Sequence, residues 1–167
     1  MAKIVVPTPN TVITSAWGTS VAEALNLDWE LGYGERTTPL AIGTGVEASA
    51  NTIAATAAIA LDGHPILIEF FAPQITLPAG VGSTFNLWFF QDATSLGVVS
   101  STMNVVAGQA TMPVYAARRL AAPSGSHAYT ARAACSAGTG NVAAAAGGPG
   151  LANPAFIRVT RAAGPTF

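Results

Sequence analysis

Charged side chains are scarce in this 167-residue sequence. Lys, Arg, Asp and Glu together make up 9% of it, whereas ordinary soluble domains contain about 25%. Hydrophobic residues account for 50% of the chain, so we expect one domain with a sizeable core. Burial in an oligomer or a larger shell would explain how so uncharged a chain stays soluble, and a neutral secreted domain is the alternative.

The sequence also has little material for metal chemistry. It contains one cysteine, Cys135, and two histidines, His64 and His127. A lone cysteine excludes an intrachain disulfide, and these side chains are too few for a four-ligand zinc site. Asp62 and Asp92 lack a calcium-loop pattern, and the glycines of residues 138–150 lack the Walker pattern. We therefore expect no metal and no cofactor, and expect Cys135 to be a small buried apolar residue.

Acidic residues are missing from the last part of the chain. Residues 1–92 carry eight acids against two bases, a formal charge of −6, whereas residues 93–167 carry five Arg and neither Asp nor Glu. Two parts of a chain with opposite charge usually neutralise each other within the fold or across a protomer interface. A basic tail that binds nucleic acid would instead be rich in Lys and would have no acidic part to neutralise it. We expect no nucleic-acid partner and assign the basic residues to inter-subunit or sandwich assembly: Arg118, Arg119, Arg132, Arg158 and Arg161.

Catalytic, leader and membrane patterns are also lacking. Ser124, Ser126 and His127 stand together in Pro-Ser-Gly-Ser-His, but without a nucleophile elbow we expect a turn there and no enzyme activity. His64, between Gly63 and Pro65, is expected in a hairpin turn. Residues 1–10 lack the apolar run of a signal peptide, and no apolar window is long enough to predict a membrane span.

The N-terminal residues 1–26 predict an extended arm followed by a short helix. Pro7 and Pro9 disfavour a helix in residues 1–13, and Thr14 is a suitable N-cap for a helix that ends near Leu25. Apolar residues recur there at helical spacing and form one stripe. So short a helix must dock to be stable, so we assign this segment to attachment. The attachment residues are Val12, Ile13, Trp17, Val21 and Leu25.

Residues 51–167 predict an antiparallel β-sandwich, joined to the arm by a connecting segment at 27–50. About eight apolar or alternating runs, separated by Gly, Pro, Ser and Asn, favour a sandwich or barrel. Asp62-Gly63-His64-Pro65 predicts a hairpin turn between two of them. The predicted strands are Thr52–Leu61, Ile66–Phe71, Thr84–Gln91, Leu96–Val106, Ala110–Leu120, His127–Cys135, Asn141–Ala145 and Phe156–Arg161.

Two stretches of the predicted sandwich stand out. Phe85-Asn-Leu-Trp-Phe-Phe carries bulk on both faces, which predicts a central strand or one sealed by a neighbouring protomer. We therefore assign Trp88 and Phe90 to assembly, with a sugar-binding aromatic platform as the alternative. The small residues of the Gly/Ala-rich tract 134–153 would allow either a close backbone approach or a mobile loop.

Several segments together resemble a known family. Pro113-Val-Tyr-Ala-Ala-Arg-Arg-Leu, Pro123-Ser-Gly-Ser-His-Ala-Tyr-Thr-Ala-Arg and Pro154-Ala-Phe-Ile-Arg-Val-Thr-Arg look like the terminal β-domain in virion proteins of tailed bacteriophages that infect actinobacteria. The segment Val12-Ile-Thr-Ser-Ala-Trp-Gly-Thr-Ser-Val-Ala-Glu-Ala-Leu-Asn is similar to the attachment segment that precedes such domains.

The resemblance implies an all-β, jelly-roll sandwich, similar to trimeric tumour-necrosis-factor-like modules, on the outside of a virion. Long minor tail proteins carry such a domain after a large N-terminal body, which this sequence lacks, so we favour a capsid decoration protein. Its expected partners are the major capsid protein and itself, as a homotrimer. A minor tail or fibre module that binds a host receptor or glycan is the alternative.

Overall fold

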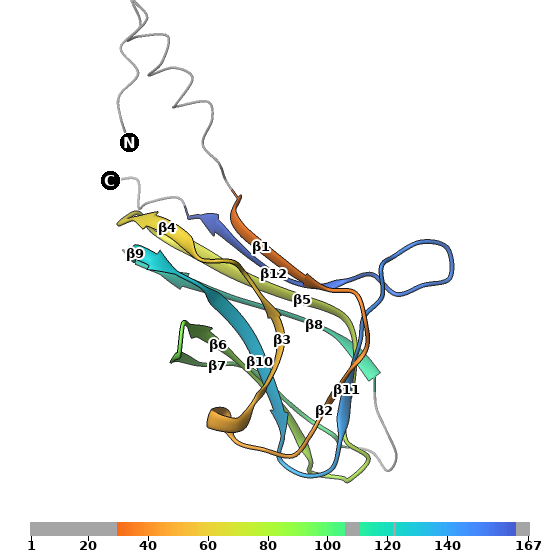
Figure 1. Cartoon of the computed structure of the whole chain (residues 1–167). Coiled ribbons are helices and arrows are strands. Elements are labelled where there is room, and N and C mark those ends of the chain that lie inside the picture. Colours follow the sequence, from red (N-terminus) through yellow and green to blue (C-terminus); the bar gives the residue numbers. More distant parts are fainter. Residues whose placement is uncertain (1–29, 106–110, 122, 163–167) are drawn as a thin grey trace, which may run out of the picture.

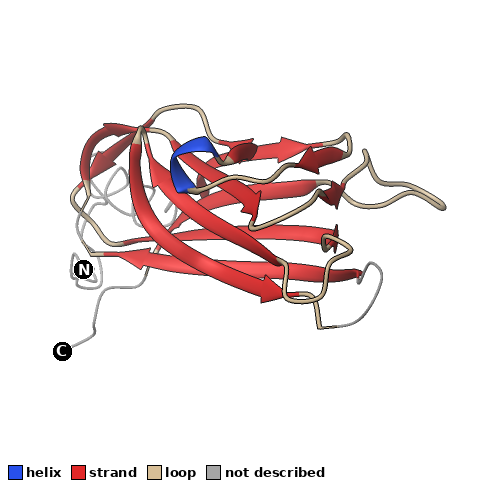
Figure 2. Cartoon of the chain, turned by 90° about the horizontal axis from the view of Figure 1, so that it is seen from below, coloured by secondary structure: helices blue, strands red, loops and turns tan. Residues whose placement is uncertain are grey.

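The computed structural model describes residues 30–105, 111–121 and 123–162. The predicted arm and helix, with Val12, Ile13, Trp17, Val21 and Leu25, lie outside these residues. The described chain is built almost wholly of strands, and η1 (Glu47–Ser49) is a short 3-10 helix (Figure 2). The strands are β1 (Glu30–Arg36), β2 (Leu40–Ile42), β3 (Asn51–Ala55), β4 (Ile59–Asp62), β5 (Ile66–Thr76), β6 (Thr84–Gln91), β7 (Thr94–Met103), β8 (Thr111–Leu120), β9 (Ser124–His127), β10 (Tyr129–Cys135), β11 (Gly140–Ala143) and β12 (Ala155–Arg161).

The first sheet is organised around the long strand β5 (Figure 1). One edge of β5 pairs with β8, and the other edge pairs with β12 along its first half and with β11 along its second half. Beyond these, β1 pairs with β12 and β2 pairs with β11. The second sheet has the order β3-β10-β6-β7, and the β4–β9 ribbon continues from β3 and β10.

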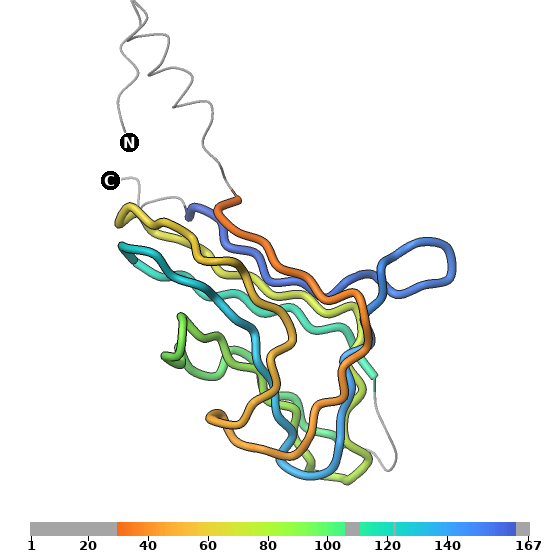
Figure 3. The backbone as a smooth tube through the Cα atoms, in the orientation of Figure 1, coloured from red at the N-terminus to blue at the C-terminus, as the bar shows by residue number. Residues whose placement is uncertain are grey.

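The strand order is that of a jelly roll. Four pairs of successive strands each continue along the same partners and can be counted as one strand: β1–β2, β3–β4, β9–β10 and β11–β12 (Figure 3). With β5, β6, β7 and β8, the described chain then has eight strands. Numbered along the chain, the first sheet then has the order 1-8-3-6 and the second the order 2-7-4-5. The ladders between these described strands are antiparallel. The predicted all-β, antiparallel jelly-roll sandwich is confirmed.

Three local predictions differ from the structure. The connecting segment 27–50 contains β1 and β2, which are strands of the first sheet. The turn at residues 62–65 is not a hairpin, because β4 pairs with β9 whereas β5 belongs to the first sheet. The turn expected at residues 123–126 is for the most part strand β9. Gly63 has a positive φ of 84° and His64 does lie in a turn, one that carries the chain from one sheet to the other.

The core lies between the two sheets and follows from alternation along the strands. On β5, Ile66, Ile68, Phe70 and Ala72 point inward and are at most 1% exposed. They meet inward residues of the second sheet, of which Phe85, Leu87, Phe89 and Tyr129 are the largest. Cys135 is buried among them as predicted, and burial raises the pKa of its thiol.

The Gly/Ala-rich tract 134–153 contains one close contact between backbones and most of one projecting loop. At Gly140 of β11, an added Cβ would lie 2.8 Å from the carbonyl oxygen of Thr76. Residues 144–154 then leave the sheet as a loop that projects from the sandwich before β12 begins (Figures 1 and 3). Of the two alternatives for this tract, close backbone approach is confirmed at Gly140.

Gly34 on β1 lies against the backbone of β3 in the other sheet, and this contact yields a stability prediction. An added Cβ there would overlap the carbonyl oxygen of Ala55 on β3, whereas a Cβ on Gly43 would meet nothing within 4 Å. We expect Gly34→Ala to lower the free energy of unfolding by about 1–3 kcal/mol through overpacking. Gly43→Ala is the matched control and should change it by less than about 0.5 kcal/mol. Urea unfolding measures both, and equal effects would contradict the close approach.

Candidate functional site

Aromatic and charged side chains gather on the outer side of the first sheet. Residues paired in register share a face of the sheet. Tyr33, Arg158 and Glu69 form one such row, and Glu35, Phe156, Phe71 and Tyr115 form the next. The row positions alternate with inward core residues on β12, β5 and β8, and with glycines on β1. We call this set the aromatic face: Tyr33, Glu35, Glu69, Phe71, Tyr115, Phe156 and Arg158.

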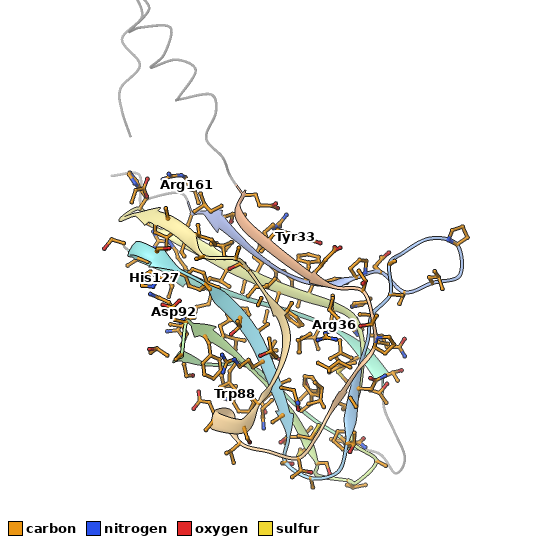
Figure 4. All side chains as sticks on the ribbon, viewed as in Figure 1. Tyr33, Arg36, Trp88, Asp92, His127 and Arg161 are labelled. Atoms are coloured by element: carbon orange, nitrogen blue, oxygen red, sulfur yellow. The ribbon has the colours of Figure 1, made fainter. Side chains whose placement is uncertain are left out.

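Three rings of the aromatic face touch one another, and the face remains open to solvent. Tyr33 stacks on Phe156 with ring centroids 5.7 Å apart and an interplanar angle of 29°. Phe71 lies 5.8 Å from Phe156 on its other side. Tyr33 is 43% exposed and Tyr115 is 62% exposed, while Phe71 and Phe156 are half-buried. Figure 4 shows Tyr33 on the outside of its strand. The four rings of the aromatic face therefore extend across four neighbouring strands.

Two glutamates fix the polar groups of this face. Glu69 accepts hydrogen bonds from Arg158 Nε and Nη2 at 3.2 and 2.9 Å and from the Tyr115 hydroxyl at 2.6 Å. Its side chain is 12% exposed, and that of Arg158 is 41% exposed. Glu35 is exposed and accepts a 3.0 Å bond from the Tyr33 hydroxyl. Both phenols therefore have their hydroxyl groups held in place.

These bonds keep the phenols protonated. Burial, followed by the hydrogen bond to Glu35, raises the pKa of Tyr33. The hydrogen bond to Glu69 is the main cause that raises the pKa of Tyr115. Both hydroxyl groups are therefore neutral donors throughout the physiological range.

Trp88 and Phe90 lie elsewhere, on the outer side of the second sheet. They are 6% and 5% exposed and pack with Ala134 and Ala50. The guanidinium carbon of Arg132 lies 4.2 Å from the centre of the Phe90 ring. β6 thus carries buried bulk on both faces and lies between β10 and β7, as predicted for a central strand. The side chains that bury Trp88 and Phe90 therefore belong to the same protomer.

The remaining predicted assembly residues make contacts within the protomer. Arg158 pairs with Glu69, and Arg161 pairs with Asp62 at 2.7 Å. The Arg161 guanidinium holds the pKa of Asp62 well below its usual range. Arg118 donates to the carbonyl of Leu96, Arg132 donates to the Thr130 hydroxyl, and Arg119 is exposed on β8 opposite Leu67. Two of the five Arg residues therefore neutralise acids from the first half of the same chain.

His127 forms a separate polar cluster at the β6–β7 turn. Its Nδ1 lies 2.7 Å from Asp92 Oδ2, and its Nε2 lies 2.9 Å from the carbonyl oxygen of Ser124 (Figure 4). Asp92 also accepts a 2.9 Å bond from the Ala128 amide. Both ring nitrogens face acceptors, so the charged imidazolium fits this site best. The hydrogen bond to Asp92 raises the pKa of His127, and the Ala128 amide, followed by His127, lowers that of Asp92.

Within the described ranges, no three His, Cys, Asp or Glu side chains come together as metal ligands would. In the same part of the chain, no helix has the length and hydropathy to cross a bilayer.

Sequence reasoning assigned Arg158 of the aromatic face to assembly but missed its rings, and it chose the rings of Trp88 and Phe90. Tyr33 and Phe156 are distant in the sequence and meet only through the β1–β12 pairing. One signal was present in the sequence: Phe156, Arg158 and Thr160 alternate with Ile157 and Val159 along β12. Such alternation predicts an outer face with an aromatic and a cation on it.

No protein-family model and no curated protein matches the chain. Among solved structures, similarity extends to infectious bursal disease virus, Gx strain, with 11% identity, a TM-score of 0.40 and coverage of 80% of this chain and 36% of the viral one. The C-terminal CBM6 of LamC from Zobellia galactanivorans has 14% identity, a TM-score of 0.29 and coverage of 81% and 95%. A carbohydrate-binding module of Cellvibrio mixtus lichenase 5A, in complex with cellotriose, has 14% identity, a TM-score of 0.26 and coverage of 84% and 95%. The chain thus spans little more than a third of the viral chain it matches.

The His127–Asp92 pair predicts a pH-dependent stability. Because the folded pKa of His127 is raised above 6.5, its contribution is fully present below that pH and is lost as the pH rises through the folded value. We expect the stability advantage of the native protein over Asp92→Asn to shrink between about pH 6 and about pH 8. Asn tolerates the positive φ of 54° at this position. Urea unfolding at both pH values measures the difference, and an advantage independent of pH would contradict the pairing.

The two glutamates of the aromatic face should differ in their effect on stability. Glu69 is nearly buried and satisfies three donors, so we expect Glu69→Ala to lower the free energy of unfolding by about 1–3 kcal/mol. Glu35→Ala removes one exposed bond and should change it by less than about 0.5 kcal/mol. Chemical denaturation compares them, and equal losses would show that Glu69 does not anchor the face.

Proposed function

We propose that this chain is a structural virion protein of a tailed bacteriophage, a capsid decoration protein that binds the outside of the head shell as an oligomer. The observation that carries the proposal is the closed antiparallel jelly roll, which is the fold that the resemblance to phage virion proteins implies. The scarcity of charge fits a protein that works within a larger assembly.

Attachment is assigned to the segment that precedes the sandwich. The described strands begin at Glu30, so none of them is drawn from residues 1–26. The apolar residues Val12, Ile13, Trp17, Val21 and Leu25 of that segment bind the major capsid protein in this proposal. The sandwich then stands on the outer surface of the shell and associates as a homotrimer.

A second candidate is a minor tail or fibre module that binds a host receptor or glycan. The observation in its favour is the aromatic face, because stacked aromatic side chains with fixed hydroxyl groups can bind small polar molecules. The two candidates differ in where the protein sits on the particle. Neither uses enzyme activity, and neither requires a cofactor.

Deletion of residues 1–25 tests the attachment role. Because all described strands remain, we expect a folded sandwich that no longer sediments with particles stripped of this protein. Circular dichroism verifies the fold, and sedimentation equilibrium should give three times the mass of the truncated chain, as it should give three times 16.8 kDa for the full chain. The full chain is the positive control. Undiminished particle binding by the truncated protein would remove the attachment role from this segment.

A further inference from the structure

Resting on the proposed function, we propose that the aromatic face binds neutral oligosaccharides, so that the decorated particle carries a glycan-binding surface. A sugar ring presents a patch of C–H groups on its face and hydroxyl groups around its rim. A site for it needs exposed aromatic rings bordered by fixed hydrogen-bonding groups. The aromatic face supplies both.

The rings provide the apolar part of the site. Phe156 lies between Tyr33 and Phe71, at 5.7 and 5.8 Å, and Tyr115 follows Phe71 in register on β8. The row crosses four strands, hence three strand spacings, or about 14 Å. Tyr33 and Tyr115 are the most exposed of these rings and lie on the outermost strands of the row. An extended sugar chain would run across the strands and contact both phenols.

The polar part of the site is preorganised. Glu35 is exposed and has a carboxylate beside the Tyr33 hydroxyl, so it can accept hydrogen bonds from sugar hydroxyl groups. Arg158 is fixed by two bonds to Glu69 and still exposes 41% of its side chain. Because these groups are held before any ligand arrives, binding costs little ordering entropy.

The charges of the face favour an uncharged ligand with hydroxyl donors. Arg158 neutralises Glu69, which leaves Glu35 as the unneutralised charge of the set. An anionic sugar or phosphate would meet that carboxylate and be repelled. A neutral sugar hydroxyl can instead donate a hydrogen bond to the Glu35 carboxylate. The face therefore suits a ligand with hydrogen-bond donors and no negative charge.

The size of the face argues against a second protein as its main occupant. Its two rows are two residues apart along the strands, so it measures about 14 by about 7 Å between backbone positions. Even with the breadth of the side chains, this is far below the roughly 800 Å² per partner of a stable protein interface. A sugar chain is narrow enough to be covered by such a strip.

The full chain should be tested on an array of neutral hexose oligosaccharides together with acidic ones that bear sialic or uronic acids. We expect saturable binding to members of the neutral set, followed up by isothermal titration calorimetry. Tyr33→Ala and Tyr115→Ala should each weaken binding about tenfold through loss of a ring. Tyr33→Phe, which keeps the ring, should weaken it less than Tyr33→Ala does. Val98→Ala, at a 54% exposed site on β7 of the other sheet, is the matched control and should leave binding unchanged.

Each contrary outcome identifies a different error. Absence of binding to every neutral oligosaccharide, binding only to acidic ones, or equal affinity of Tyr33→Ala and native protein would overturn the inference. Loss of self-association in Tyr33→Ala, seen by sedimentation equilibrium without any glycan binding, would make the face a contact between copies. Co-sedimentation of the same variants with stripped particles tests the proposed function separately. Glycan binding without particle binding would contradict the decoration role but would support the glycan site.

Discussion

The pairing of β5 with three other strands is the constraint on which the rest of the structure depends. β5 has eleven residues and holds β8 along one edge and β12 and β11 along the other. Its inward residues Ile68 and Phe70 belong to the core, and the adjacent Glu69 and Phe71 belong to the aromatic face. A slip of one residue would exchange these two sets, burying Glu69 and exposing Phe70. The same register therefore determines the core and the candidate site.

The uneven distribution of charge along the sequence follows from this arrangement. β12 comes from the acid-free part of the chain and lies beside β5, which comes from the acidic part. Arg158 thereby meets Glu69, and Arg161 meets Asp62 at the end of β4. The exposed Arg161–Asp62 pair contributes little to stability, whereas Glu69 of the other pair is nearly buried. The Arg158–Glu69 pair also lowers the net charge of the aromatic face, which consists mainly of aromatic rings and hydroxyl groups.

Much of the fold could be predicted from the sequence, because strand existence depends on local patterns. β6 was predicted with its observed bounds, since turn residues stop its run of aromatic and apolar side chains on both sides. The turn at residues 62–65 was mistaken for a hairpin because turn chemistry is local, whereas the assignment of β4 and β5 to different sheets depends on distant strands. The aromatic face escaped prediction for the same reason. Tyr33 and Phe156 have ordinary neighbours in the sequence and become partners only through strand register, while Trp88 and Phe90 attracted attention by bulk that serves packing.

The central claim is that the jelly roll stands on a virion surface with its aromatic face available to a ligand. Electron cryomicroscopy of the native particle tests it most directly, because one reconstruction locates the chain and everything that lies against it. The account predicts density for the sandwich on the outside of the capsid, joined to the shell by the segment before Glu30, with Tyr33, Phe156 and Tyr115 facing solvent. A map in which these side chains are packed against the shell or a neighbouring subunit would contradict it.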